Sequence, residues 1–367
     1  MKILSLGLEQ LVLDKDSSVT QRILSYGRLV NKYTIIVPHS KNKSVDLSDN
    51  VQAFGIGGNA KIFQFFNIYK FASNLLKRNH YDLITVQDQY YLALLGWFLA
   101  KRYKLALEIQ VHGIEKYGGL RKIIAHYVLP KANAVRTVSD RLRSRLLDIF
   151  GVDGSKIMVV PIYTEKIQAT DDKDYKLKNP AVLLTISRLV PIKNIELQLK
   201  ALAALIKENF NVQLWVVGDG PAEKRLKELS RNLKVEKYVK FWGWHDKLEN
   251  FYQQADCFLL TSGFEGWGMV VIEAARYGLP IIMTDVGCAG EVIKNRESGL
   301  IIPINDLEKL IEALQEVITN DNLRCSLGTK AKDAIKTLPT NEQTLTLYKN
   351  SWDKAVTNAK LNNKKQQ

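Results

Sequence analysis

The sequence predicts an α/β protein built from two doubly wound parallel sheets, each in its own domain. In both halves short apolar runs alternate with stretches of helical composition, which is typical of parallel α/β folds. At 367 residues the chain exceeds the usual size of one hydrophobic core. A polar, aperiodic segment, residues 164–179, separates the halves. We therefore expect domains at residues 1–163 and 164–340, followed by residues 341–367, whose helix packs back on the first domain and ends in a basic tail.

The apolar runs give the strands in order. In the first half we expect strands at Lys2–Leu6, Tyr33–Val37, Leu83–Val86, Ala106–Val111 and Ala134–Val138. In the second half we expect them at Ala181–Ser187, Gln213–Val217, Val239–Trp242, Cys257–Leu260, Ile281–Thr284 and Gly299–Ile302. Helical patterns include Ile68–Lys77, Arg141–Phe150, Met269–Tyr277 and Thr344–Val356. These elements alternate as a doubly wound sheet requires.

Composition places the chain among soluble globular proteins of the cytoplasm. It is 46% hydrophobic and 25% charged. The best candidate for a membrane span, Tyr90–Ala100, is about half the length that a bilayer requires. Glu9 and Asp14 interrupt any apolar region of a signal peptide. The three cysteines are odd in number and widely spaced, which favours reduced thiols over disulfides.

The positive charge is concentrated in the first half. Residues 1–165 hold 23 Lys+Arg against 13 Asp+Glu, whereas residues 166–340 hold 24 against 23. This bias suggests an anionic partner for the first half, such as an acidic membrane surface, a phosphate-bearing acceptor or nucleic acid, although charge that only aids solubility explains it too. The candidate membrane contacts are Lys101, Arg102, Lys104, Arg121, Lys122, Arg141, Arg143 and Arg145, with Phe63, Phe65, Phe66 and Tyr69 beside them.

Two glutamates follow the predicted strand Cys257–Leu260. Glu265 lies in a glycine-bearing loop, and Glu273 lies about one turn into the helix that follows. A strand, such a loop and a helix N-terminus together form an anion site. Glu265 would then lie beside a phosphate, and Glu273 would suit a pair of vicinal hydroxyls, such as those of a ribose. Either glutamate alone fits a solvated surface position equally well.

Two cations follow the predicted strand Ala181–Ser187. Arg188 and Lys193 are placed to clamp a diphosphate, through a planar fork and a point charge respectively. Two fixed cations could neutralise a leaving diphosphate in place of a metal ion. Gly218 and Gly220 let the backbone approach a ligand closely, although one such turn is a weak signal.

Other candidates are less specific. Trp242 and Gly243 end a strand where a nucleobase could stack, although core aromatics explain them equally well. His112 follows the strand Ala106–Val111 and could hydrogen-bond a sugar hydroxyl or stabilise developing positive charge, but a lone histidine is more often structural. The histidines show no ligand spacing, so the sequence predicts no metal site.

In their order along the chain these motifs resemble the retaining glycosyltransferases of family 4 (glycosyl transferases group 1), which have the GT-B fold of two Rossmann-like domains facing a cleft. The resemblance covers the second half continuously, through Ser187–Lys193, Val217–Pro221, Phe241–Gly243, Glu265–Gly268 leading to Glu273, Gly278–Pro280, Gly287–Glu291 and Gly299–Leu300. The first half matches more loosely, through Val111–Gly113, Ala132–Ser139 and Val160–Pro161. It departs from the family after the first strand, where many members carry paired glycines and this chain has only Gly7. The placement of the acceptor by that loop is therefore left open.

The resemblance implies a metal-independent hexosyltransferase without a cofactor, which moves a sugar from a nucleotide-diphosphate donor to a glycan or lipid-linked acceptor. By family likeness its catalytic residues would be His112, Arg188, Lys193 and Glu265. The donor-binding set would be Arg188, Lys193, Gly218, Gly220, Trp242, Gly243, Glu265, Gly266, Trp267, Gly268, Met269, Val270 and Glu273. Bacterial surface polysaccharide or glycolipid synthesis, in the cytoplasm or at the cytoplasmic face of the membrane, is the expected role.

Three other classes stay open at this point. A GT-B epimerase or phosphorylase would share the fold and the phosphate site. A non-catalytic protein of the same fold is less favoured, because the cations, both glutamates and His112 occur together. A nucleic-acid-binding protein is suggested by the basic first half alone, and no recognisable motif supports it.

Overall fold

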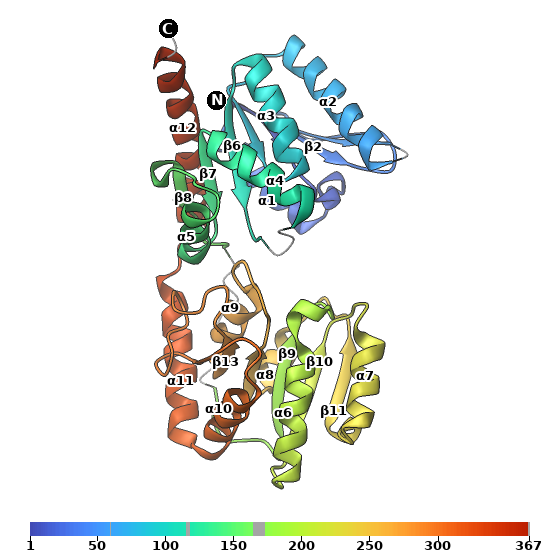
Figure 1. Cartoon of the computed structure of the whole chain (residues 1–367), viewed down its shortest axis with the longest axis vertical. Coiled ribbons are helices and arrows are strands. Elements are labelled where there is room, and N and C mark those ends of the chain that lie inside the picture. The colour runs from blue at the N-terminus through green and yellow to red at the C-terminus, as the bar shows by residue number, and fades with distance from the viewer. Residues whose placement is uncertain (59, 115–117, 164–172, 366–367) are drawn as a thin grey trace. The chain divides into compact units, whose positions relative to one another are not determined.

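The computed structural model describes residues 1–58, 60–114, 118–163 and 173–365 (Figure 1). The chain forms two compact units. Unit 1 comprises Met1–Pro161 and Pro339–Gln367, and unit 2 comprises Ile162–Leu338. These bounds lie two residues from the expected boundaries at 163 and 340. Each unit holds its own mostly parallel sheet, so both halves of the chain are the α/β folds that the alternating pattern predicts.

The sheet of unit 1 has eight strands in the order β3-β4-β2-β1-β5-β6-β7-β8. They are β1 (Lys2–Leu6), β2 (Lys32–Pro38), β3 (Lys43–Ser48), β4 (Val51–Ile56), β5 (Leu83–Val86), β6 (Ala106–Val111), β7 (Ala134–Thr137) and β8 (Ile157–Val159). Only β3 runs antiparallel to its neighbour. The chain reverses its direction across the sheet between β1 and β5, which is where such sheets open a crevice at the carboxyl ends of the strands.

Two groups of helices cover the two faces of this sheet. Its helices are α1 (Ser18–Gly27), α2 (Lys61–Arg78), α3 (Tyr91–Tyr103), α4 (Gly119–Val128), α5 (Asp140–Asp148) and α12 (Asn341–Lys365). Gly96 of α3 packs against Val86, so closely that an added Cβ would lie 2.6 Å from its Cγ2. Neighbouring strand residues point to the other face, where Thr85 and Glu108 meet α12. Helices α2, α3 and α4 contact one another in series.

The C-terminal helix is anchored to unit 1 by a fully buried side chain and a buried ion pair. Trp352 of α12 is completely buried in the core of this unit. Glu108, inside β6, pairs with Arg136 of β7 at 3.5 Å and accepts a hydrogen bond from Ser351 of α12. The Arg136 guanidinium lies 3.6 Å from the ring centroid of Tyr348. Truncating Trp352 to alanine should cost about 3–5 kcal/mol, so this helix is an integral part of unit 1.

The sheet of unit 2 has six parallel strands in the order β11-β10-β9-β12-β13-β14. They are β9 (Ala181–Ile186), β10 (Val212–Val217), β11 (Val239–Gly243), β12 (Cys257–Leu260), β13 (Ile281–Thr284) and β14 (Leu300–Ile302). The helices are α6 (Ile195–Lys207), α7 (Glu223–Asn232), α8 (Glu249–Gln254), α9 (Met269–Arg276), α10 (Leu307–Thr319) and α11 (Asp321–Ala334). The strand order reverses between β9 and β12, so the crevice of this sheet lies at the carboxyl ends of those two strands.

The segment expected to be a linker is partly packed on unit 2. Residues 164–172 lie outside the described residues. Lys173 donates a hydrogen bond to the carbonyl of Ala255 at 2.8 Å, and burial lowers its pKa to about 8. The buried guanidinium of Arg324 donates to the carbonyl of Tyr175 at 3.1 Å. Lys173 and Tyr175 therefore contact unit 2, whereas Asp174 between them is exposed and accepts a hydrogen bond from the backbone N–H of Lys176 at 2.9 Å.

Three strands and one helix start escaped prediction. Strands β3, β4 and β8 were not expected, and α2 begins at Lys61, seven residues before the predicted helix. Helix α12 extends to Lys365, so the expected basic tail is helical as far as that residue. No helix within the described ranges is long and apolar enough to cross a membrane.

Candidate active site

The predicted cations and glutamates of the second half meet at the carboxyl ends of β9 and β12. These strands are neighbours in the sheet and flank the point where its strand order reverses. Lys193 ends a short 3-10 turn, Pro191–Lys193, between β9 and α6. Glu265 lies in the loop between β12 and α9. Parallel strands end at the same edge of a sheet, so residues distant in sequence converge there.

Lys193 and Glu265 form an ion pair in this crevice. The distance between Lys193 Nζ and Glu265 Oε1 is 2.5 Å, and the two side chains are 17% and 12% exposed. Ser262 Oγ donates to the same carboxylate oxygen at 2.7 Å. The pair fixes a positive and a negative group side by side in partly dehydrated surroundings, where charge interactions are stronger than in water. Such a pair can serve one ligand that carries both a phosphate and a hydroxyl.

A buried hydrogen-bond network ties the two loops together. Thr261 Oγ1 donates to the carbonyls of Lys193 and Asn194, at 3.2 and 3.0 Å. Gln198 of α6, which is also buried, donates to Thr261 Oγ1 at 2.9 Å. The backbone N–H of Gly263 donates to the carbonyl of Ile192, the residue before Lys193, at 2.7 Å. The network therefore sets the position of Lys193 relative to the loop that carries Glu265.

The loop after Glu265 ends at the N-terminus of α9. Gly268 adopts a left-handed conformation with φ of 87°, and no side chain caps the helix. The backbone N–H groups of Met269 and Val270 begin the helix, where amide groups and the helix dipole favour an anion. Trp267 is buried, and its carbonyl accepts a hydrogen bond from the backbone of Cys288 at 2.8 Å. The backbone of Trp267 therefore lies in the loop between β12 and α9, and its indole belongs to the core.

Arg188 and the two glycines of the β10 loop lie beside this crevice. The side chain of Arg188 is exposed. A Cβ on Gly218 would lie 2.0 Å from the carbonyl oxygen of Ser187, and one on Gly220 would lie 2.5 Å from that of Leu189. Both glycines have positive φ, 122° and 151°. They let the β10 loop pack against the loop that carries Arg188, a packing role that the sequence did not suggest.

Trp242 and Gly243 end β11 at the outer edge of the sheet. Trp242 is 40% exposed, and its ring packs on Trp215 and Phe251 with both centroid distances at 5.3 Å. The carbonyl of Gly243 accepts a hydrogen bond from Gly218 at 2.7 Å. The indole of Trp242 thus has both core contacts and an exposed face, and the stacking of a nucleobase on that face stays a prediction.

Glu273 lies on α9 and has a partner that the sequence did not reveal. Tyr252 donates its hydroxyl to Glu273 Oε2 at 2.7 Å, and its ring stacks on Tyr277 at a centroid distance of 5.2 Å. Burial raises the pKa of Glu273, while the hydrogen bond from Tyr252 opposes that rise. The second carboxylate oxygen is left for another donor. No sequence signal marks Tyr252, because α8 and α9 become neighbours only in the fold.

His112 follows β6 at the carboxyl edge of the sheet of unit 1. Its side chain is exposed, and the carbonyl of the next residue, Gly113, accepts a hydrogen bond from Gln89. The pKa of His112 lies below its ordinary value because surrounding protein displaces water from the ring and because Arg136 and Arg22 oppose its protonation. Because the ring keeps an exposed face, the positive charges of Arg136 and Arg22 explain the lower pKa better than burial does. His112 is therefore a neutral imidazole near neutral pH.

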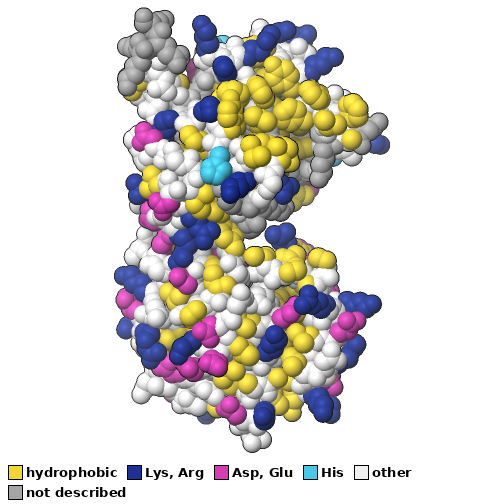
Figure 2. Space-filling view, in the orientation of Figure 1, with side chains coloured by type: hydrophobic (Ala, Val, Ile, Leu, Met, Phe, Trp, Pro, Cys, Tyr) yellow, Lys and Arg dark blue, Asp and Glu magenta, His cyan; other side chains and the backbone are white. Residues whose placement is uncertain are grey.

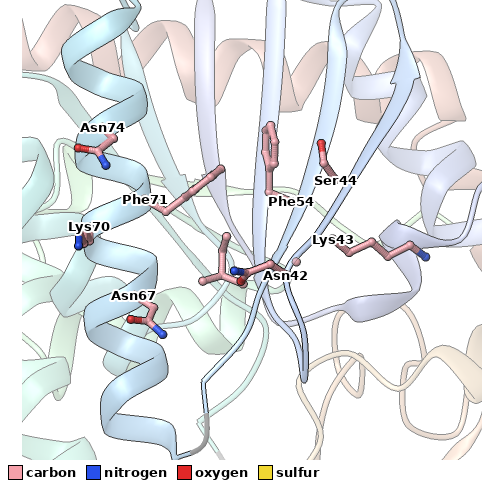
Figure 3. Close-up of a pocket in the computed structure, with 10 residues that line it drawn as sticks. Asn42, Lys43, Ser44, Phe54, Asn67, Lys70, Phe71 and Asn74 are labelled. Atoms are coloured by element: carbon pink, nitrogen blue, oxygen red, sulfur yellow. The ribbon is translucent and has the colours of Figure 1, made fainter.

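Within the described part of the chain, no three His, Cys, Asp or Glu side chains gather in a way that could hold a metal ion. A shallow cavity of about 560 Å³ lies between the β3–β4 hairpin and α2 of unit 1 (Figure 3). Asn67, Lys70 and Asn74 lie along α2 at its side, and Phe54 and Phe71 point toward each other. Asn67 donates a hydrogen bond to the carbonyl of Gly57 at 2.9 Å.

Family models match both halves of the chain. The model described as glycosyl transferases group 1 matches residues 167–334, which contain the crevice between β9 and β12. The model described as glycosyltransferase family 4 matches residues 30–162. The chain belongs to glycosyltransferase family 4. The family expected from the motifs is confirmed.

Curated relatives of this family-4 chain match it over part of its length. A lipopolysaccharide core biosynthesis glycosyltransferase of Rhizobium meliloti is 29% identical over 44% of this chain and 47% of its own. An alpha-monoglucosyldiacylglycerol synthase of Streptococcus pneumoniae is 29% identical over 58% of this chain and 53% of its own. A GDP-mannose-dependent phosphatidylinositol monomannoside mannosyltransferase of Mycobacterium tuberculosis is 27% identical over 55% and 56%. The chain spans about half the length of these three relatives.

Solved structures match nearly the whole family-4 chain. A lipopolysaccharide outer core galactosyltransferase gives a TM-score of 0.75 at 18% identity, covering 96% of this chain and 99% of its own. A sucrose-phosphate synthase of Thermosynechococcus elongatus gives 0.77 at 18% identity, covering 97% and 100%. The Anabaena protein HepE, solved with UDP-glucose, gives 0.71 at 17% identity, covering 97% and 100%. These likenesses confirm the GT-B fold.

Proposed function

We propose that the chain is a retaining glycosyltransferase that moves a hexose from a nucleotide-diphosphate sugar to a glycan or lipid-linked acceptor. The observation that carries the proposal is the Lys193–Glu265 pair beside the uncapped N-terminus of α9, at the crevice between β9 and β12. A cation and helix amides suit a diphosphate, and a carboxylate suits sugar hydroxyls.

Each site residue takes one part in the reaction. Lys193 and Arg188 bind the diphosphate, together with the backbone from Gly266 to Val270. Glu265 accepts hydrogen bonds from the sugar hydroxyls, and Glu273 accepts them from the ribose through the oxygen that Tyr252 leaves available. Gly218, Gly220, Trp242 and Gly243 shape the nucleotide end. His112 is the catalytic candidate of unit 1.

The chemical step needs no group beyond substrates and protein. The bond between the anomeric carbon and the β-phosphate oxygen breaks, and its electron pair leaves with the diphosphate. The acceptor hydroxyl attacks the same face of the sugar and passes its proton to a β-phosphate oxygen. The products are the glycoside with retained configuration and the nucleoside diphosphate. Lys193, Arg188 and the amides of α9 stabilise the departing charge, so we propose that no metal ion takes part.

The relatives support a role in bacterial surface polysaccharide or glycolipid synthesis. Their names concern lipopolysaccharide core, a glucosyldiacylglycerol and a phosphatidylinositol mannoside, and one structural neighbour is bound to UDP-glucose. The test is a panel of UDP-, GDP- and ADP-sugars, each assayed for nucleoside diphosphate release with and without lipid and oligosaccharide acceptors. Acceptor-dependent release from one donor supports the proposal. Epimerised sugar from donor alone, or no release from any donor, contradicts it.

A further inference from the structure

One face of unit 1 exposes large apolar side chains over three neighbouring helices. Figure 2 shows hydrophobic side chains gathered over the part of unit 1 where Figure 1 places α2, α3 and α4. Their exposed fractions run from 44% to 66%, in Ile62, Phe63 and Phe66 of α2, Tyr91 and Phe98 of α3, and Leu120, Ile123 and Tyr127 of α4. We call these residues the apolar helix face. Soluble domains rarely leave so large a set of apolar side chains together in water.

The face is continuous across the helices. Helix α3 contacts both α2 and α4. Between α3 and α4, the rings of Trp97 and Tyr127 meet edge to face with centroids 5.1 Å apart. On α4, Leu120, Ile123 and Tyr127 recur at helical spacing, so one side of this helix is apolar and exposed along its length.

The charged residues within these three helices all have one sign. The sequences of α2, α3 and α4 contain four, two and two Lys or Arg residues and no Asp or Glu. Lys101 Nζ lies 5.3 Å from the ring centroid of Trp97, and Lys131 Nζ lies 3.6 Å from that of Tyr127. Other exposed helices mix both signs: α7 and α10 each carry lysine with several glutamates. An apolar face on helices whose charged residues are all cationic is complementary to an anionic, amphipathic surface.

We propose that the apolar helix face docks on the anionic leaflet of a lipid bilayer. Exposed Phe63, Phe66 and Ile123 enter the boundary between head groups and acyl chains, and the lysines and arginines contact lipid phosphates. The partner is thus a lipid surface, and docking is peripheral.

The docking surface excludes some of the membrane contacts suggested by the sequence. Helix α5, which carries Arg141, Arg143 and Arg145, also carries Asp140 and Asp148, so its charge is mixed. Phe65 and Tyr69 are half-buried. The docking surface therefore comprises α2, α3 and α4 without α5.

The face also reaches the functional edge of unit 1. In a doubly wound sheet the helices run antiparallel to the strands, so their first turns lie near the carboxyl ends of the strands. Ile62 and Phe63 lie in the first turn of α2, and Leu120 lies in the first turn of α4. His112 follows β6 at that same edge. If the acceptor is lipid-linked, as the proposed function states, it would then reach this edge without leaving the bilayer.

The experiment measures binding to vesicles without donor or acceptor, so it is independent of turnover. Wild-type chain is sedimented with vesicles of equal parts phosphatidylglycerol and phosphatidylcholine, and with pure phosphatidylcholine vesicles. We expect binding to the anionic vesicles at low salt and its loss toward ~1 M salt, where the screening length is about 3 Å. The variants Phe66→Asp/Ile123→Asp and Lys101→Glu/Arg102→Glu should each bind at least about tenfold more weakly.

Matched changes in unit 2 serve as controls. Ile304→Asp replaces an apolar residue that is 43% exposed, and Lys247→Glu/Lys294→Glu reverses two exposed lysines. Both should bind anionic vesicles like wild type, and circular dichroism should show all variants folded. Equal binding of wild type to neutral vesicles overturns the proposal, as does wild-type binding by either unit 1 variant. A vesicle-free dimer that Phe66→Asp/Ile123→Asp dissociates would also overturn it, because a second copy would then cover the face.

Discussion

Replacing Lys193 by methionine removes the charge of the proposed diphosphate clamp while keeping most of the side chain's length. Lys193 is 17% exposed, and its ammonium group lies 2.5 Å from Glu265. Loss of one preorganised donor that stabilises developing negative charge costs about 2.7–4 kcal/mol, or roughly 10²–10³ in turnover. We therefore expect Lys193→Met to lower kcat by about this factor.

The structure also predicts how the effect divides between kcat and KM. Without donor, Lys193 already has a partner in Glu265, so diphosphate binding replaces or shares an existing interaction. The gain in the ground state is then smaller than the gain when charge develops on the leaving group. We expect KM for the donor to change by less than about tenfold, with most of the loss in kcat.

The assay is nucleoside diphosphate release at saturating acceptor, with melting temperature as the check on folding. Lys200→Met is the matched control, because Lys200 is an exposed lysine on α6, the helix that follows the site loop. It should leave both kinetic parameters unchanged. A folded Lys193→Met variant with at least half the wild-type kcat would refute the clamp.

Four further outcomes follow from the same site. Glu273→Ala should raise KM for the donor more than it lowers kcat, because ribose hydroxyls are bound equally in the ground and transition states. Glu265→Ala should mainly lower kcat. If both variants changed KM and kcat alike, Glu273 and Glu265 would not have the separate roles proposed here. Burial raises the pKa of Glu273, so as the pH is lowered KM for the donor should begin to rise at a pH above the usual range of carboxyl pKa values. Tyr252→Phe removes a hydrogen bond that lowers this pKa, so the rise should begin at a still higher pH. Coinciding pH profiles of KM for wild type and Tyr252→Phe would contradict this. Thr261→Val should cost about 1–3 kcal/mol in unfolding free energy and also lower kcat, because Gln198 loses a buried acceptor and the Lys193 carbonyl loses its donor; an unchanged kcat would mean that the network does not position Lys193. Chelation with EDTA should leave the rate unchanged, and a strict requirement for added magnesium would contradict the metal-free step.

The strands and loops that form the site could be predicted from the sequence. Cys257–Leu260 is an apolar run bounded by polar and glycine residues, so both the strand β12 and the loop after it could be predicted. The same holds for β9 and the cations that follow it. Parallel strands end at one edge, so the approach of these two loops follows from topology.

The contacts inside the site could not be predicted in this way. Thr261 and Gln198 are ordinary residues in sequence, and their role arises only because α6 packs beneath the loop after β12. Glu108 and Arg136 gave a faint signal, as charges within apolar strands, yet their partner Ser351 lies 243 residues from Glu108. Strand β3 was missed because it is an exposed antiparallel edge strand with alternating polar residues and no apolar run.

The central claim is transfer of a hexose with retention of configuration, and the anomeric configuration of the product tests it most directly. The donor found in the nucleotide-sugar panel, whose sugar has a known anomeric configuration, is incubated with its acceptor. The product is followed by proton NMR alongside nucleoside diphosphate release. We predict a product with the same anomeric configuration as the donor, and one nucleoside diphosphate released for each sugar transferred. A product of the opposite anomeric configuration, or sugar transfer without matching nucleoside diphosphate, would contradict the account.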